Sequence, residues 1–142
     1  MLDQKTIEIV KSTAPILRER GEEITKEFYR DMFERYPEVK SMFDMNKQKD
    51  GSQPKALANA VWNAAINIDN MENMRAFVSK IGVTHVKSQV KPEHYPIVGE
   101  CLLKAVKTVL NVDDEVINAW EKAYDELAKF YIQIEEELYQ KA

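Results

Sequence analysis

Residues 84–99 read THVKSQVKPEHYPIVG and contain both histidines of the chain, His85 and His94. The apolar spacing before His85 is that of an amphipathic helix, so His85 lies where this helix ends. Taken alone, a histidine at the end of such a helix is more often a surface or core residue than a metal ligand. His94 precedes the helix that we expect to begin at Pro96, a place that favours a structural or surface role. The residues upstream decide what His85 does.

Upstream of His85 the chain carries an aromatic pair, a lone aromatic, an amide and a leucine: Phe28-Tyr29, Phe43, Gln53 and Leu57. A helical chain with these residues ahead of a histidine resembles a haem globin. The segments EHYPIVG (93–99) and QPKALA (53–58) resemble, more closely, the bacterial haemoglobins whose globin also forms the front half of flavohaemoglobins. The resemblance covers essentially the whole chain. It implies an all-α globin fold, a three-over-three helical sandwich that encloses a pocket for haem b.

The composition excludes several other classes of protein. A chain of 142 residues is long enough for a single domain, residues 1–142, with a core of its own. The net charge of −4 argues against a general nucleic-acid binder, which needs a basic face. No apolar run is long enough to span a membrane, and the first residues lack the pattern of a signal peptide. The single cysteine, Cys101, cannot form an internal disulfide, so we expect a cytoplasmic protein.

Apolar residues recur at helical spacing along most of the chain, which indicates an all-α fold. Pro15 should bend or open the first helix, because proline lacks the backbone donor that a helix interior needs. Ser52 is the expected N-cap of the helix that carries Gln53 and Leu57. The expected breaks between helices are, in chain order, Gly21, Pro37, a surface loop over 44–51, a boundary near Asn70, the loop after Thr84, and a turn over 111–113.

The resemblance assigns a role to each residue of the expected pocket. His85 would be the proximal ligand of the haem iron, with its second ring nitrogen donating a hydrogen bond. Phe43 would clamp the haem edge and Leu57 would overlie the iron, although both could equally be core residues. Tyr29 would donate a hydrogen bond to iron-bound dioxygen, or else be a core tyrosine with a satisfied hydroxyl. Gln53 stands where many globins have histidine, and an amide on an apolar stripe needs a buried partner or a pocket.

Glu135 lies on the apolar stripe of the last helix beside Tyr124 and Tyr131, because each residue turns the helix by about 100°. A carboxylate in an apolar stripe is costly unless it is paired or hydrogen-bonded. The resemblance supplies a partner, since Tyr95 and Glu135 would hydrogen-bond around His85 and make the imidazole more anionic. Such a ligand favours oxygen activation over simple carriage. The alternative is a glutamate whose carboxylate reaches solvent near the C-terminus.

The resemblance implies two functions, and the sequence leaves a third to weigh against them. The first is nitric oxide dioxygenase activity, in which iron-bound dioxygen reacts with nitric oxide to give nitrate. Its expected catalytic residues are Tyr29, Gln53, Tyr95 and Glu135. The sequence has no Gly-x-Gly-x-x-Gly turn and no room for flavin and nicotinamide domains, so we expect an external electron-donating reductase. The second is binding, storage or delivery of dioxygen in the same pocket, where carbon monoxide and cyanide would also bind. The third is a haemless interaction or sensor module, which the retention of the pocket residues disfavours.

Overall fold

Most of the residues described by this computed structural model, 2–141, are helical, and that part contains no strand. The elements, in chain order, are α1 (Gln4–Ser12), α2 (Ala14–Arg35), the 3-10 helix η1 (Pro37–Met42), α3 (Met45–Lys49), α4 (Ser52–Ile66), the 3-10 helix η2 (Met71–Met74), α5 (Arg75–Lys87), the 3-10 helix η3 (Pro92–His94), α6 (Tyr95–Leu110) and α7 (Asp114–Lys141). The predicted all-α class is confirmed.

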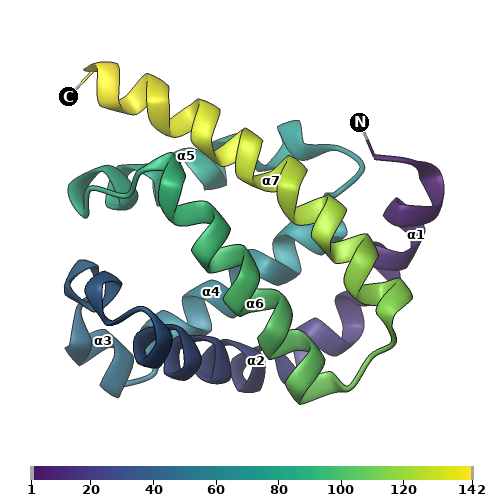
Figure 1. Cartoon of the computed structure of the whole chain (residues 1–142). Helices are drawn as coiled ribbons and strands as arrows, with labels where there is room; N and C mark the ends of the chain where they lie inside the picture. Colours follow the sequence, from purple (N-terminus) through teal and green to yellow (C-terminus); the bar gives the residue numbers. More distant parts are fainter. Residues whose placement is uncertain (1, 142) are drawn as a thin grey trace.

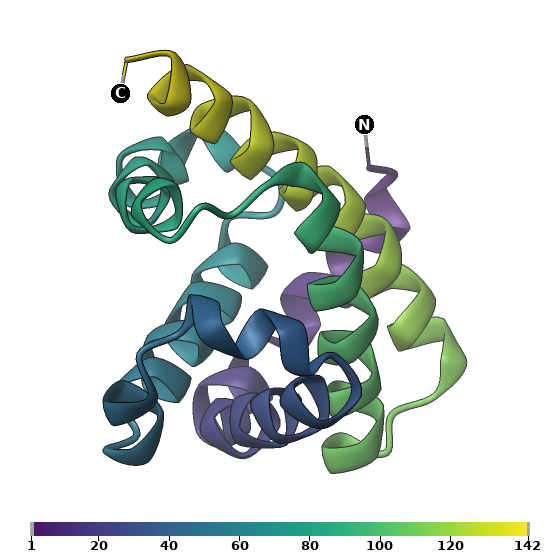
Figure 2. The same cartoon turned by 60° about the vertical axis from the view of Figure 1, so that its left-hand side comes forward.

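The helices form two groups that share α6 (Figure 1). On one side, α2 packs against α4 and α6, and on the other, α7 packs against α1, α5 and α6. The α5 helix packs on α7 and on the short η2 that leads into it, and it stands apart from α2 (Figure 2). None of the described helices is long and apolar enough to cross a membrane.

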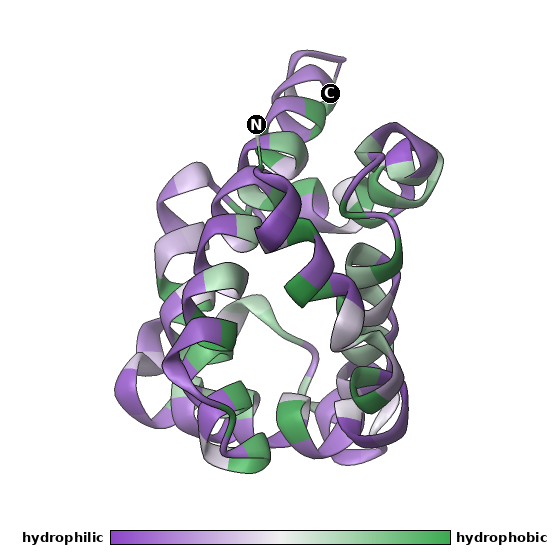
Figure 3. Ribbon diagram, turned by 90° about the vertical axis from the view of Figure 1, so that its right-hand side faces the viewer, coloured by the Kyte–Doolittle hydropathy of each residue, from purple (hydrophilic) through white to green (hydrophobic). Residues whose placement is uncertain are grey.

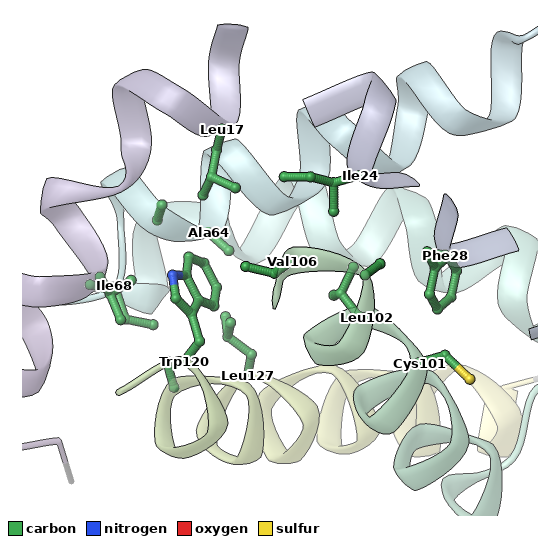
Figure 4. Close-up of a cluster of buried hydrophobic side chains, with 14 of the residues drawn as sticks. Leu17, Ile24, Phe28, Ala64, Ile68, Cys101, Leu102, Val106, Trp120 and Leu127 are labelled. Atoms are coloured by element: carbon green, nitrogen blue, oxygen red, sulfur yellow. The ribbon is translucent and has the colours of Figure 1, made fainter. Parts of the chain in front are cut away.

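Most of the buried apolar residues lie on α2, α4, α6 and α7, which together enclose the core. Figure 3 colours the ribbon by the hydropathy of each residue. Trp120 and Leu127 of α7 point toward Ala64 and Val106 from the facing helices (Figure 4). The indole Nε1 of Trp120 donates a hydrogen bond to Thr13 Oγ1 at 3.1 Å. This bond ties α7 to the junction of α1 and α2, and satisfies the polar atom of a buried aromatic.

An ion cluster built around the buried Asp31 carboxylate joins α2 to α6. The Asp31 carboxylate, whose side chain is 7% exposed, accepts hydrogen bonds from Arg35 Nη2 at 2.8 Å and Lys104 Nζ at 3.3 Å. Arg35 also pairs with Glu100 at 2.9 Å, and the Tyr36 hydroxyl donates to the same carboxylate at 2.8 Å. The buried Asp31 carboxylate stays charged, because Arg35 and Lys104 both donate hydrogen bonds to it.

Gly21 does not end a helix, so that prediction is wrong. The break falls at Thr13, because α2 begins at Ala14 with Pro15 in its first turn and continues through Gly21. A Cβ added at Gly21 would lie 3.0 Å from the Cβ of Ala58 on α4. The glycine therefore permits the close approach of α2 and α4. The predicted break at Pro15 is confirmed.

The expected surface loop over 44–51 contains a helix, α3, so that prediction is also wrong. The Asp44 carboxylate caps α3 by accepting a hydrogen bond from the Asn46 amide at 2.9 Å. Ser52 is not the N-cap of α4 either, because Gly51 takes that place with a left-handed φ of 84°. The Asp50 carboxylate accepts the Ser52 amide at 2.8 Å. A short capped helix thus lies directly before α4.

Three other boundaries shift by a few residues. The α4 helix ends at Ile66, where the backbone N–H of Asn67 donates to the Asn63 carbonyl at 3.2 Å, rather than near residue 70. The α5 helix begins after η2 and runs to Lys87, so His85 lies inside its last turn rather than after it. The α6 helix begins one residue before Pro96. The predicted end of α2 before Pro37 and the turn over 111–113 are confirmed.

Candidate functional site

A large cavity lies between the two groups of helices, with walls from α2, η1, α4, α5, α6 and α7. The volume that the centre of a water molecule can occupy in this cavity is about 240 Å³. Because about 10–15 Å³ on this measure holds one water, the cavity has room for a much larger ligand. Most of the lining is apolar. Almost every predicted site residue lines it: Tyr29, Phe43, Gln53, Leu57, His85 and Tyr95. Glu135 lies directly behind His85 and Tyr95.

On one wall of the cavity, His85 is tied to a buried carboxylate. Glu135 on α7 is 4% exposed, and its Oε2 atom lies 2.5 Å from His85 Nδ1. The Tyr95 hydroxyl donates to the other carboxylate oxygen, Oε1, at 2.6 Å. The hydrogen bond to Glu135 places a proton on Nδ1, so Nε2 is the ring nitrogen with a lone pair for a metal. The alternative of a solvent-reaching Glu135 is contradicted by this burial.

The helix packing brings the carboxylate within reach of the imidazole. A Cβ added at Gly82, one turn before His85, would lie 2.8 Å from Leu138 Cδ1 and 3.4 Å from Glu135 Cγ. The missing side chain lets α5 lie close to α7 at the height of Glu135. No larger residue at position 82 would allow the same contact without a shift of Leu138.

Partly buried tyrosines lie around this carboxylate and remain protonated. Burial, followed by the hydrogen bond to Glu135, raises the pKa of Tyr95 far above its ordinary value. Burial also raises the pKa of Tyr131 to about 12, with the nearby charge of Glu135 adding to the effect. The Tyr124 hydroxyl donates to the Tyr95 carbonyl at 2.7 Å and so fixes the start of α6. Tyr95 is therefore a hydrogen-bond donor held in place.

The opposite wall carries Tyr29, which is 6% exposed and sits in an aromatic cluster. Its ring lies 4.9 Å from that of Phe28, 5.7 Å from that of Phe33 and 5.5 Å from that of Phe43, between centroids. Burial raises the pKa of Tyr29 strongly, and the neighbouring amides of Gln48 and Gln53 offset this only in part. The phenol is therefore a fixed, protonated donor beside an apolar cavity.

The sequence analysis missed several polar residues of the site. His94, expected to be structural or on the surface, lines the cavity; its Nδ1 accepts the Lys91 amide at 2.9 Å, which leaves the proton on Nε2. Thr84 and Ser88 also line the cavity. Gln48 lies on α3 near Tyr29. His94 could have been suspected from its position just ahead of Pro96, but Gln48 was hidden by the expectation of a loop.

The residues present fit a haem. An apolar slot of this size suits a flat ring, and an imidazole nitrogen on one wall suits an axial ligand of iron. The phenol and amide on the other wall suit a small polarised ligand of that iron. The hydroxyls of Thr84 and Ser88 and the Nε2–H of His94 provide donors for acidic groups on the ring edge.

Comparisons with known proteins agree with this geometry. The family model described as Globin matches residues 26–130. A bacterial globin of Campylobacter jejuni has 57% sequence identity and a TM-score of 0.95, over 97% of this chain and 99% of that structure. A flavohaemoglobin of Malassezia yamatoensis, solved with bound FAD and haem, has 29% identity and a TM-score of 0.88, over 98% of this chain and 38% of that structure.

A flavohaemoprotein of Bacillus thuringiensis subsp. konkukian is 51% identical over 142 residues. The match covers 100% of this chain but 35% of that relative, so the chain spans about a third of its length. These matches support a haem cofactor and haem-based binding of gases. Together with the helical fold and the cavity between its two groups of helices, they establish that the chain belongs to the globin family, with homology to the globin domains of flavohaemoproteins.

Proposed function

We propose that the protein binds haem b through His85, binds dioxygen reversibly, and converts nitric oxide to nitrate with electrons from a separate reductase. The observation that carries the proposal is the buried Glu135 carboxylate, which engages His85 Nδ1 with one oxygen and Tyr95 with the other. When bound, haem would supply the iron at which dioxygen and nitric oxide react. The protein's own residues would prepare that iron from both sides.

The proximal residues raise the electron-donating power of the imidazole. The buried Glu135 carboxylate accepts a hydrogen bond from the Nδ1–H of His85, so negative charge builds on the ring and Nε2 becomes a stronger ligand. Tyr95 holds the carboxylate in place by donating to its other oxygen, Oε1. The raised pKa of Tyr95 keeps its proton in place, so it continues to donate at neutral pH. This arrangement favours chemistry at the iron over simple carriage.

The distal residues hold and orient the gas. Tyr29 donates from a fixed phenol, and Gln53 offers an amide from the first turn of α4. Phe43 and Leu57 supply apolar contacts that exclude water from the reacting atoms. Thr84, Ser88 and His94 would meet the acidic edge of the ring. The flavohaemoprotein relatives support a reductase as the partner that restores ferrous iron.

The test is a stopped-flow reaction of the oxygenated protein with nitric oxide. We expect one equivalent of nitrate per haem, at a rate that Glu135→Gln lowers. Exposed Glu136, the next residue along α7, gives the matched control, because Glu136→Gln should leave that rate unchanged. Release of dioxygen without nitrate would overturn the enzymatic proposal and indicate a protein that binds, stores or delivers dioxygen.

A further inference from the structure

We propose that Gln48 is a positioning residue of the distal pocket: its side-chain amide, which makes no hydrogen bond in this structure, is placed to donate to the Tyr29 hydroxyl and to aim the phenol at the bound gas. The proposal deepens the proposed function. It rests on haem-based binding of dioxygen at this site, and does not depend on the reaction with nitric oxide.

The first observation is a buried donor without a partner. Gln48 Nε2 has almost no contact with solvent, and among residues 2–141 it is the one such side-chain nitrogen or oxygen with no hydrogen bond. Buried amide groups are almost always satisfied, because an unmet donor carries its full desolvation cost. An orphaned donor beside a functional pocket indicates a bond that the site uses.

The second observation is the identity of its neighbour. The Tyr29 hydroxyl lies beside the side-chain amides of Gln48 and Gln53, and both oppose the effect of burial on its pKa. Gln53 lines the cavity, whereas Gln48 is absent from the cavity wall within the described chain. Gln48 therefore lies outside the wall of the ligand space. An amide in that position acts on a bound gas through Tyr29 and not by direct contact.

The third observation is that the backbone fixes Gln48. The backbone N–H of Gln48 donates to the Asp44 carbonyl at 3.2 Å, and the backbone carbonyl of Gln48 accepts the Gly51 N–H at 3.3 Å. The caps at Asp44 and Asp50 hold α3 against the start of α4. With its backbone fixed, Gln48 can change only the rotamer of its side chain, which sets the direction of the amide. A phenol oxygen that accepts a hydrogen bond becomes a better donor through its own proton, since successive bonds polarise one another.

The test is Gln48→Met, which keeps the length of the side chain and removes the amide. We expect the dioxygen dissociation rate to rise about two- to tenfold, the equivalent of one net hydrogen bond. Carbon monoxide, which is less polar, should dissociate at nearly the original rate. The C–O stretching frequency of the carbon monoxide complex should rise, because the positive end of the phenol is less well aimed. The matched control is Lys49→Met, an exposed neighbour on the same helix.

A double-mutant cycle separates positioning from direct contact. Tyr29→Phe alone should raise the dioxygen dissociation rate about ten- to a hundredfold, as for a bond to a polarised ligand. Adding Gln48→Met to Tyr29→Phe should change nothing further. An unchanged rate in Gln48→Met alone, or the same fold-change with Phe at position 29, would overturn the proposal. If the protein forms no nitrate but this cycle still couples Gln48 to Tyr29, the enzymatic proposal fails and the role of Gln48 stands.

Discussion

At the scale of single residues, the sequence predicts the role of some residues of the site and not of others. Glu135 could be predicted because helical rotation places it among apolar neighbours while Glu136 and Glu137 turn to solvent. His85 and Tyr95 followed from motifs close to each other in the chain. Gln48 could not be predicted, since its meaning depends on a phenol contributed by another helix. Polar residues that serve a site through a remote partner carry no local signal.

Haem binding separates the two histidines. We expect His85→Ala to abolish the normal haem absorbance, because it removes the nitrogen that Glu135 orients toward the cavity. His94→Ala should retain nearly all of it, since His94 accepts the Lys91 backbone amide and, unlike His85, is not tied to the Glu135 carboxylate. The measurement is the absorbance spectrum with a haem titration of each variant. Loss of haem in His94→Ala alone would show that the ligand is assigned to the wrong histidine.

The proximal hydrogen bonds have a vibrational signature. If Glu135 and Tyr95 make His85 more anionic, Glu135→Gln and Tyr95→Phe should each lower the iron–histidine stretching frequency of the ferrous protein without gas. The double variant should shift it by less than the sum, because both groups act on one network. Resonance Raman spectroscopy measures this directly. A stretch that stays in place in both single variants would mean that the carboxylate only fills space, and simple dioxygen binding would then be favoured.

At the scale of helices, the sequence was informative about breaks that proline makes and misleading about glycine. Pro15 and Pro37 mark real helix boundaries because proline removes a donor wherever it stands. Gly21 and Gly82 lie inside helices, where each lets another helix approach. A glycine in a single sequence has both meanings, and only the facing residue decides between them. That residue, Ala58 for Gly21, lies in a different helix.

The contact between Gly21 and Ala58 can be tested by exchange. Gly21→Ala should lower the free energy of unfolding, because the new Cβ presses against that of Ala58 despite the better helix propensity of alanine. Adding Ala58→Gly should recover part of the loss, although Ala58→Gly alone costs about 1 kcal/mol. Urea unfolding of the three variants measures this coupling. Strict additivity of the two single changes would show that the helices do not meet there.

At the scale of the whole molecule, the cavity is made from two halves of the chain. Residues of α2, η1 and α4 form the wall with Tyr29, and residues of α5, α6 and α7 form the wall with His85. The resemblance anticipated both walls and the fold, since the motifs that carry it lie in each half. The donors Thr84, Ser88 and His94 of the cavity wall were not predicted, and neither was the ion cluster at Asp31. Both arise where elements distant in the sequence come together.

The ion cluster makes the stability of the molecule depend on pH. Burial alone would raise the pKa of Asp31, but hydrogen bonds from Arg35 and Lys104 lower it overall below its ordinary value of 3.8. A carboxyl with a lower pKa in the folded state adds stability above pH 3.8 and loses it as the pH falls through the folded value. We expect the free energy of unfolding to drop below that pH.

The assignment of this pH dependence is checked with two substitutions. Asp31→Asn should lower stability at neutral pH and flatten its decline in acid, measured by urea unfolding between pH 3 and 7. Asp125→Asn removes a carboxylate that is 72% exposed, and should leave the decline almost unchanged. An equal decline in Asp31→Asn and the unsubstituted protein would place the acid sensitivity elsewhere.

The α5 helix has few packing partners, since its main contacts among the described elements are with α7 and η2. Although Val78 of α5 reaches the core, we predict that this helix opens as a cooperative unit separate from the rest. In haem-free protein we expect its amide hydrogens to exchange with deuterium sooner than those of α2, and to slow markedly once haem joins His85 to the far wall. Identical protection in both forms would mean that α5 opens only with the whole chain. If α5 opens alone, its opening is the step that lets the cofactor enter and leave the cavity. The rate at which the protein loses haem is then set by how often α5 opens.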